Sequence, residues 1–165
     1  MMIKSEIYNK IATFLCEKGV DHNIEVFLQN GIRMSGAVAS HDEYALELVH
    51  NNQSSIINTD VINTIVVTDT KAIEEFIRNM ESFKSKPVSN NRIQENVCLM
   101  ADKTQCEVEM FFLNRINLSG HLLRYDRDIM MIFSKVNRQG KWVSMLQFVN
   151  IDNIVSCTLK VPHLR

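Results

Sequence analysis

The residue types that most often carry catalysis or bind metals are present in this 165-residue chain, but their spacing supports neither role. There is no HExxH pair, no Cys/His ligand spacing, no GxSxG turn and no phosphate-binding glycine loop. We therefore expect no enzyme activity, no cofactor and no metal ion. The histidines are scattered, at His22, His41, His50, His121 and His163.

The cysteines point to a cytoplasmic protein. They show no CxxC spacing and have apolar neighbours, so we interpret them as reduced core residues, with zinc or a disulfide as the alternative. No uncharged apolar run reaches the roughly 18 residues that a membrane span needs, and the start MMIKSEIYNK lacks an apolar signal core. The cysteines are Cys16, Cys98, Cys106 and Cys157.

A turn in the second half of the chain carries a different chemistry. Around the sequence NRQGK stand Lys135, Arg138, Lys141 and Trp142. Cations contact phosphates and aromatic rings stack on bases, so this set is a possible basic patch for nucleic acid. The alternative is a solvated turn with one packed indole.

The net charge of −1 hides an asymmetry between the two halves of the chain. Residues 1–83 carry six Lys/Arg against twelve Asp/Glu, whereas residues 84–165 carry twelve against seven. Such halves favour head-to-tail association of chains or a polyanionic partner that meets mainly the second half. Solvated surfaces without a partner are the alternative.

An internal repeat indicates which elements position these residues. NGIRMSGAVASHDEY, residues 30–44, returns as NRINLSGHLLRYDRD, residues 114–128, and apolar strand-like runs flank both copies. We interpret the chain as a duplication of a unit of about 70 residues. Units of that size are marginally stable alone and gain from partners that bury more surface.

Periodicity predicts the elements of each copy. Ile7, Ile11, Phe14 and Leu15 recur at helical spacing in a helix that ends at Gly19, and residues 71–83 and 93–103 predict two further helices. Residues 24–28 alternate as a strand, and Asn30-Gly31 predicts a hairpin turn. Gly36 falls within the next strand and predicts a sharp bend or a close backbone approach.

A short helix before five strands, with the pattern Asn-Gly-Ile-basic-apolar-x-Gly and a downstream Asp, resembles Hfq, the bacterial Sm-like RNA chaperone. The stretch VINTIVV is similar to the family's second motif, and IQENV is similar to its helix start. The resemblance implies a mainly β fold of two Sm-like small barrels, each with a short N-terminal α-helix and five strongly bent antiparallel strands, joined by a helical linker. It assigns residues 1–68 to the first domain, 69–90 to a linker with an amphipathic helix, and 91–165 to the second domain.

Hfq proteins pair the edge strands of six subunits into a ring. For a chain with two units, the resemblance implies a homotrimeric pseudo-hexameric ring. The physical argument agrees, because unpaired sheet edges are a liability until they are covered. Two units on one chain also raise the effective concentration for half of the contacts.

The resemblance also implies RNA-binding residues. In the family, one ring face takes A-rich RNA, and an aromatic residue, an apolar floor, a basic neighbour and a closing-strand hydroxyl have counterparts in this chain. Packing on the sheet is the alternative role for Phe27, Ile32 and Ile116. The matching positions are Phe27, Gly31, Ile32, Arg33, Thr64, Phe111, Arg115 and Ile116.

The pore face, which reads U-rich RNA in the family, is matched less completely. Tyr44 stands at the aromatic position, and Gln94 and Glu95 stand at the helix start. The family's Tyr-Lys-His run has no counterpart in either copy, and most of its arginine-rich rim is absent.

These observations predict an RNA chaperone for post-transcriptional regulation that binds single-stranded, A-rich RNA on a ring face. The rival hypothesis is a ring that has lost most RNA binding and acts as a protein-interaction scaffold. The missing rim, the near-neutral net charge and the acidic first half favour that rival.

Overall fold

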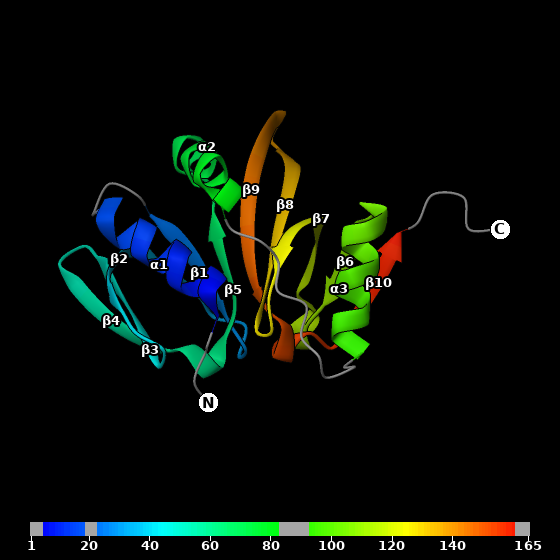
Figure 1. Cartoon of the computed structure of the whole chain (residues 1–165). Helices are drawn as coiled ribbons and strands as arrows, with labels where there is room; N and C mark the ends of the chain where they lie inside the picture. The colour runs from blue at the N-terminus through cyan, green and yellow to red at the C-terminus, as the bar shows by residue number, and fades with distance from the viewer. Residues whose placement is uncertain (1–4, 19–22, 83–92, 161–165) are drawn as a thin grey trace.

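The computed structural model describes residues 5–18, 23–82 and 93–160, and these residues form a mainly β fold (Figure 1). In the first half, one helix precedes five strands: α1 (Glu6–Lys18), β1 (Ile24–Leu28), β2 (Arg33–His41), β3 (Ala45–His50), β4 (Gln53–Asn58) and β5 (Ile62–Val67). A helix, α2 (Thr70–Arg78), follows. The second half has the same order: α3 (Ile93–Thr104), β6 (Glu107–Phe111), β7 (Asn117–Tyr125), β8 (Ile129–Arg138), β9 (Lys141–Asn150) and β10 (Ser156–Lys160).

The predicted fold class is confirmed: a helix followed by antiparallel strands forms an Sm-like fold, and the second helix and further strands are consistent with a second unit. The three predicted helices are present, but the one expected over residues 71–83 is an α-helix only as far as Arg78 and continues as a 3-10 turn over Asn79–Ser82. The Asn30-Gly31 turn joins β1 to β2 with Gly31 at φ +83°. Gly19, expected to end the first helix, lies outside the described residues.

All ten strands belong to one sheet, in the order β10-β6-β7-β8-β9-β5-β1-β2-β3-β4. Each half has the same internal pairing, because β1 lies between β2 and β5 just as β6 lies between β7 and β10. The halves are joined where β5 pairs antiparallel with β9. Among the described strands, β4 and β10 are therefore the two edges of the sheet.

Gly36 and Gly120 occupy equivalent places in the two halves and serve close backbone approach. A Cβ at Gly36 would lie 2.9 Å from the carbonyl oxygen of Val49, and one at Gly120 would lie 2.5 Å from that of Phe133. Shortly after each glycine the pairing shifts by one residue, between Val38 and Ser40 and between Leu122 and Arg124. The close approach expected for Gly36 is present in both halves.

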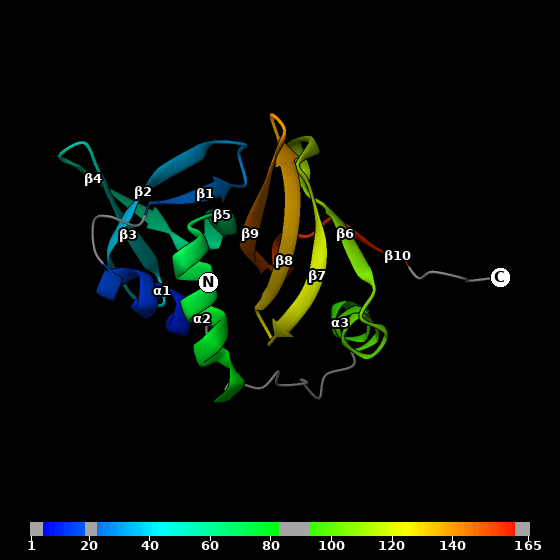
Figure 2. The ribbon, with the colours of Figure 1, turned by 90° about the horizontal axis from the view of Figure 1, so that it is seen from above.

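Apolar side chains from both halves meet at the β5–β9 junction. The larger buried cluster contains α1, β1 and β5 residues together with Ile129, Met131, Leu146 and Phe148 of β8 and β9. Figure 2 shows α1, α2 and α3 along the same side of the sheet, with α2 between the other two. The ring of Phe76 on α2 packs edge-on against Phe14 of α1 and against Phe148 of β9, at centroid distances of 5.7 and 5.8 Å.

Polar contacts also link the two halves. Ser5 Oγ donates a hydrogen bond of 2.6 Å to Asp126 Oδ2, and both residues are buried. Gln29 donates its side-chain amide to Asn153 Oδ1, while Asn153 Nδ2 donates to the carbonyl oxygen of Ile62 at 2.8 Å. The junction thus combines strand pairing, a shared apolar core and specific hydrogen bonds.

Within the described ranges, no helix is both long enough and apolar enough to cross a membrane. The cysteines in these ranges are all free thiols, with Cys98 and Cys106 buried and Cys16 and Cys157 half-buried.

Candidate nucleic-acid interface

The β1–β2 turn presents an apolar side chain and a cation to solvent. Gly31 N–H donates to the carbonyl of Leu28 at 3.0 Å, and Asn30 Oδ1 accepts from the backbone of Ile32 at 3.1 Å. This tight turn leaves the Ile32 side chain 53% exposed. Arg33, the next residue, is also exposed, and its guanidinium lies 3.8 Å from the Glu25 carboxylate. Both chemical types can contact a nucleotide, the first its base and the second its phosphate.

Three of the predicted residues share one rung of the sheet. Phe27 pairs with Arg33 across β1–β2 and with Thr64 across β1–β5. Phe27 is half-buried, whereas Thr64 is fully buried, and its hydroxyl has no hydrogen-bond partner among the described residues. An unsatisfied buried hydroxyl costs about 1–3 kcal/mol. Because the Thr64 side chain has no exposed surface, a ligand on the face of the sheet could not supply this hydroxyl with a partner.

The equivalent turn of the second half has a different backbone. Residues Leu113–Arg115 form a short 3-10 turn, and Arg115 adopts φ +62°, a left-handed conformation that glycine favours. The Phe112 N–H still donates to the carbonyl of Ile116 at 2.9 Å. Phe111 is 37% exposed, Arg115 is exposed and Ile116 is half-buried. All three residues predicted for this second turn surface thus keep some exposed surface.

Two apolar residues of this second surface were not predicted from the sequence. Leu113 is 62% exposed and Val155 is 61% exposed. Val155 N–H donates to the Phe111 carbonyl at 2.8 Å, which places it beside that predicted aromatic residue. Isolated apolar residues in turns carry no sequence signal for exposure, so only the fold reveals them.

The predicted pore-face residues are not gathered within one chain. Tyr44 is 61% exposed and follows Asp42, whose Oδ1 accepts from the Tyr44 and Ala45 amides at 2.7 and 2.8 Å. Gln94 and Glu95 belong to the first turn of α3, and their side chains lie outside what the structure describes. Since α3 packs on β7 and β10, it lies at the opposite end of the sheet from β3 and Tyr44.

The predicted basic patch lies on one hairpin. Lys135, Arg138, Lys141 and Trp142 all belong to the outer part of β8–β9 and are all exposed. The Trp142 side chain is 72% exposed, so the alternative of a packed indole is wrong.

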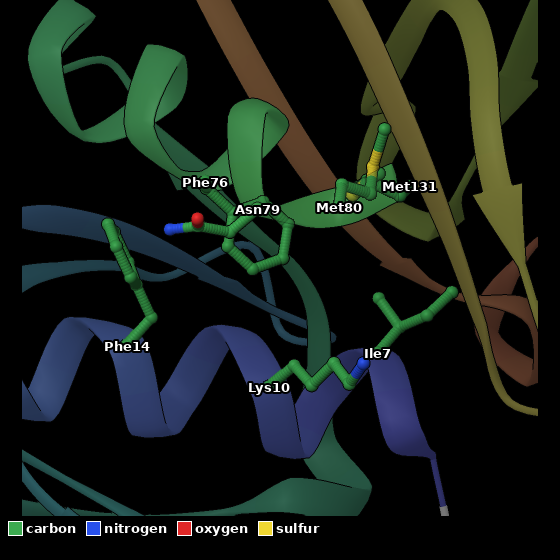
Figure 3. Close-up of a pocket in the computed structure, with 7 residues that line it drawn as sticks. All are labelled: Ile7, Lys10, Phe14, Phe76, Asn79, Met80 and Met131. Carbon is green, nitrogen blue, oxygen red and sulfur yellow. The ribbon is translucent and has the colours of Figure 1, made fainter. Parts of the chain in front are cut away.

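A hollow of about 170 Å³ lies between α1, α2 and β8 (Figure 3). Its walls are mostly apolar, and Lys10 and Asn79 add polar groups. No residue pattern predicted this hollow, because it depends on where α2 docks. The lining residues are Ile7, Lys10, Phe14, Phe76, Asn79, Met80 and Met131.

Burial is the main cause of the pKa shifts of Tyr8 and Cys157. Burial raises the pKa of the Tyr8 phenol, and the nearby Asp42 carboxylate raises it further. Burial also raises the pKa of the Cys157 thiol to about 11, with an added contribution from Cys106. Neither group ionises near neutral pH, so neither supplies a base or a nucleophile there.

The pKa values of Glu109 and Lys160, which form an ion pair between β6 and β10, shift in opposite directions. A 2.8 Å contact with Lys160 lowers the pKa of Glu109, and the same contact raises the pKa of Lys160. In the ranges that the structure covers, no group of three or more His, Cys, Asp or Glu side chains could hold a metal ion.

Comparisons with protein families and with solved structures each find a similarity to Hfq. Residues 17–73 match the model of the Hfq protein family. A crystal structure of the pleiotropic translational regulator Hfq is similar at 24% sequence identity, covering 41% of this chain and 98% of that chain, with a TM-score of 0.35. A comparison with curated protein sequences finds no match.

Proposed function

Since residues 17–73 form an Hfq-family, Sm-like unit, we propose that this protein is an RNA chaperone that binds single-stranded RNA on one face of a ring. The family is one of non-enzymatic RNA chaperones that assemble into rings. The observation that carries the proposal is the family match over the unit that presents Phe27, Ile32 and Arg33. We propose that the protein acts in post-transcriptional regulation in the cytoplasm.

We propose that residues 1–68 and 91–165 are two Sm-like domains joined by the linker 69–90. The equal order of elements in the halves supports this, as do the equivalent glycines and the pairing shifts that follow them. Within the linker, α2 packs on both halves through Phe76.

The edges of the sheet support a ring of three chains. The β5–β9 junction joins the last strand of one half to the fourth strand of the other, and the same kinds of strand, β10 and β4, remain at the edges. Contacts between two different surfaces repeat from chain to chain and close when the rotation allows it. Six units in a family ring correspond to three chains of two units.

The pairing within the chain predicts the register between chains. Phe27 and Phe111 are equivalent residues of the two halves, and they pair with Thr64 and Ser156 respectively. Thr64 and Ser156 are therefore equivalent. The next residues along these strands, Ile65 and Cys157, are equivalent too. In the same way, Ala45 pairs with Asn58 in the first half and the equivalent Ile129 pairs with Asn150 in the second. Ile56 and Phe148, each two residues before these asparagines, are therefore equivalent.

Because Ile65 pairs with Phe148 at the β5–β9 junction, Cys157 of one chain would pair with Ile56 of the next. Ile56 is 66% exposed in the single chain, whereas Phe148 is buried at 1%. The ring would therefore cover an apolar side chain that a single chain leaves in water.

RNA binding would use the rung that contains Phe27 and the adjacent turn. The Phe27 ring offers a face for stacking, Ile32 an apolar contact, and Arg33 a phosphate contact that its long 3.8 Å pair with Glu25 leaves available. The second half would contribute Phe111, Arg115 and Ile116. We propose A-rich RNA as the ligand.

A second candidate is a protein-interaction scaffold. The apolar hollow between α1, α2 and β8 favours it, because hollows with apolar walls and few polar groups commonly accept partner side chains or small molecules. The acidic first half also disfavours RNA through charge repulsion.

The deciding experiment is fluorescence anisotropy of labelled A-rich and U-rich RNA oligomers titrated with the full chain at physiological salt. We expect A-rich RNA to bind more tightly and Phe27→Ala or Ile32→Ala to weaken that binding at least fivefold. Glu74→Ala, an exposed change on α2, is the matched control. No binding to either oligomer would reject the RNA proposal and leave the scaffold.

A further inference from the structure

The outer part of the β8–β9 hairpin, residues 134–145, projects beyond the neighbouring strands and is called the arm below (Figure 1). The pairing of β8 with β7 ends at Phe133, and the pairing of β9 with β5 ends at Leu146. From Ser134 to Met145 the two strands pair only with each other. The corresponding β3 and β4 have six residues each, against ten in β8 and β9.

The arm has a defined shape at its tip. Gln139 and Gly140 form a two-residue turn with φ of +53° and +83°. The Gly140 N–H donates to Asn137 Oδ1 at 2.9 Å, which ties the turn to the end of β8. A two-residue turn of this kind follows the natural twist of a hairpin, so side chains on the arm are held in fixed positions.

The positive charges on the arm repel one another. Arg138 and Lys141 pair directly across the two strands, and like charges in that arrangement destabilise a hairpin. Lys135 adds a third cation. In the described part of the chain, none of the three forms an ion pair with a carboxylate, and the contact of Arg138 is with the sulfur of Met145 at 3.8 Å.

An aromatic ring shares a face of the arm with one of these cations. Trp142 pairs with Asn137, and Lys135 lies on the same face of the arm because side chains two residues apart share a face. The indole is 72% exposed, which leaves its ring available for stacking. Stability alone does not account for a large apolar ring in water with one uncompensated cation on its own face of the arm and two on the other face.

We propose that the arm is a second binding site for single-stranded RNA, separate from the surface formed by Phe27, Ile32 and Arg33. Trp142 stacks on a base, while Lys135, Arg138 and Lys141 contact phosphates on both faces of the arm. The choice of RNA as the ligand of this site rests on the proposed function. Each chain carries one arm, so the number of sites equals the number of chains.

Trp142 is the single tryptophan of the chain, so fluorescence excited at wavelengths that tyrosine does not absorb reports on the arm alone. The experiment titrates the full chain with unlabelled A-rich and U-rich 20-nucleotide RNA oligomers at several salt concentrations. We expect saturable quenching that weakens with salt.

The triple variant Lys135→Gln, Arg138→Gln, Lys141→Gln should bind at least tenfold more weakly. It should also lower the slope of log K against log salt by about 2, because each phosphate contact on a single strand contributes about 0.7. Lys71→Gln and Lys103→Gln, at exposed helical positions, are the matched controls and should leave both values unchanged.

Anisotropy of a labelled oligomer separates this site from the proposed ring face. Trp142→Ala should reduce affinity at least fivefold through the loss of stacking. Binding by anisotropy without quenching, and without any effect of the triple variant, would overturn the arm while the proposed function stands. Quenching that survives Phe27→Ala and Ile32→Ala would support the arm independently. Equal quenching by heparin would overturn the stacking role, and no binding in either assay would overturn both proposals.

Discussion

Asp126 Oδ2 accepts a 2.6 Å hydrogen bond from Ser5 Oγ, so the turn of one half caps the first helix of the other across 121 residues. The same oxygen accepts from the Ile7 N–H at 3.3 Å, and Ser5 Oγ accepts from the Tyr8 N–H at 3.0 Å. Asp126 Oδ1 meanwhile accepts the backbone amides of Asp128 and Ile129, both at 3.0 Å. One buried carboxylate therefore fixes both its own turn and the placement of α1 on the second half.

The Ser5–Asp126 contact should be coupled energetically. Ser5→Ala and Asp126→Asn should each lower the free energy of unfolding, by about 1 and about 1–3 kcal/mol, because each leaves buried polar groups without their partners. Urea unfolding of both single variants and the double variant measures the coupling as a double-mutant cycle. We expect a coupling of at least about 1 kcal/mol. Additive effects would show that the carboxylate acts only within its own turn.

Phe76 should be the main anchor of α2. It is 9% exposed and packs on Phe14 and Phe148, so Phe76→Ala removes the contacts that tie the helix to both halves. We expect a loss of about 3 kcal/mol, at the low end for buried Phe→Ala because α2 lies at the surface. Hydrogen exchange over residues 70–78 should accelerate. Glu74→Ala, in the same helix but exposed, should change stability by less than about 0.5 kcal/mol.

Local patterns predicted the elements, but not the contacts between the halves. The spacing of Ile7, Ile11 and Leu15 predicted α1, and all three residues are buried. The same pattern could not show that Phe14 would meet Phe76, because that contact depends on where α2 docks. The Ser5–Asp126 hydrogen bond likewise exists only because β5 pairs with β9.

In the candidate site, too, local patterns predicted the turn but not the burial that neighbouring strands impose. The Asn30-Gly31 turn signal placed Ile32 and Arg33 at a hairpin end, where both are exposed. Thr64 was predicted to face RNA, but β9 pairs beside it through Val149 and leaves its side chain fully buried. Burial at a strand junction depends on the neighbouring strand, so the residue pattern of β5 alone could not reveal it. The roles of these residues in RNA binding stay predictions.

The two strand glycines should differ in their tolerance of a methyl group. At Gly120 a Cβ would meet the Phe133 carbonyl oxygen at 2.5 Å and Ile132 Cγ2 at 2.6 Å, whereas at Gly36 the nearest atom is 2.9 Å away. Gly120→Ala should therefore cost about 2–3 kcal/mol and Gly36→Ala about 1–2 kcal/mol, both from overpacking. Thermal or urea unfolding gives the order. An equal or reversed order would mean that β7 and β8 separate more easily than their register suggests.

The proposed register between chains predicts a specific disulfide. Directly opposed residues on antiparallel strands have Cα atoms about 4.5–5.5 Å apart, which lies within the range that a disulfide spans. Ile56→Cys should therefore form a disulfide with Cys157 of the next chain under mild oxidation. Burial raises the pKa of the Cys157 thiol to about 11, so the reaction should accelerate as pH rises from 7 toward 9.5 and the thiolate fraction grows. Non-reducing electrophoresis should show species of two and three linked chains and nothing larger, because a closed ring offers three such junctions.

Two control variants test whether that link depends on the register. Adding Cys157→Ser to the Ile56→Cys variant should abolish the linked species, and Gln53→Cys, which lies on the same strand three residues away, should give none. Longer ladders would indicate an open filament, since contacts between two different surfaces continue without limit when the rotation does not close. Linkage through Gln53→Cys but not Ile56→Cys would place the strands in another register and reject the equivalence of the two junctions.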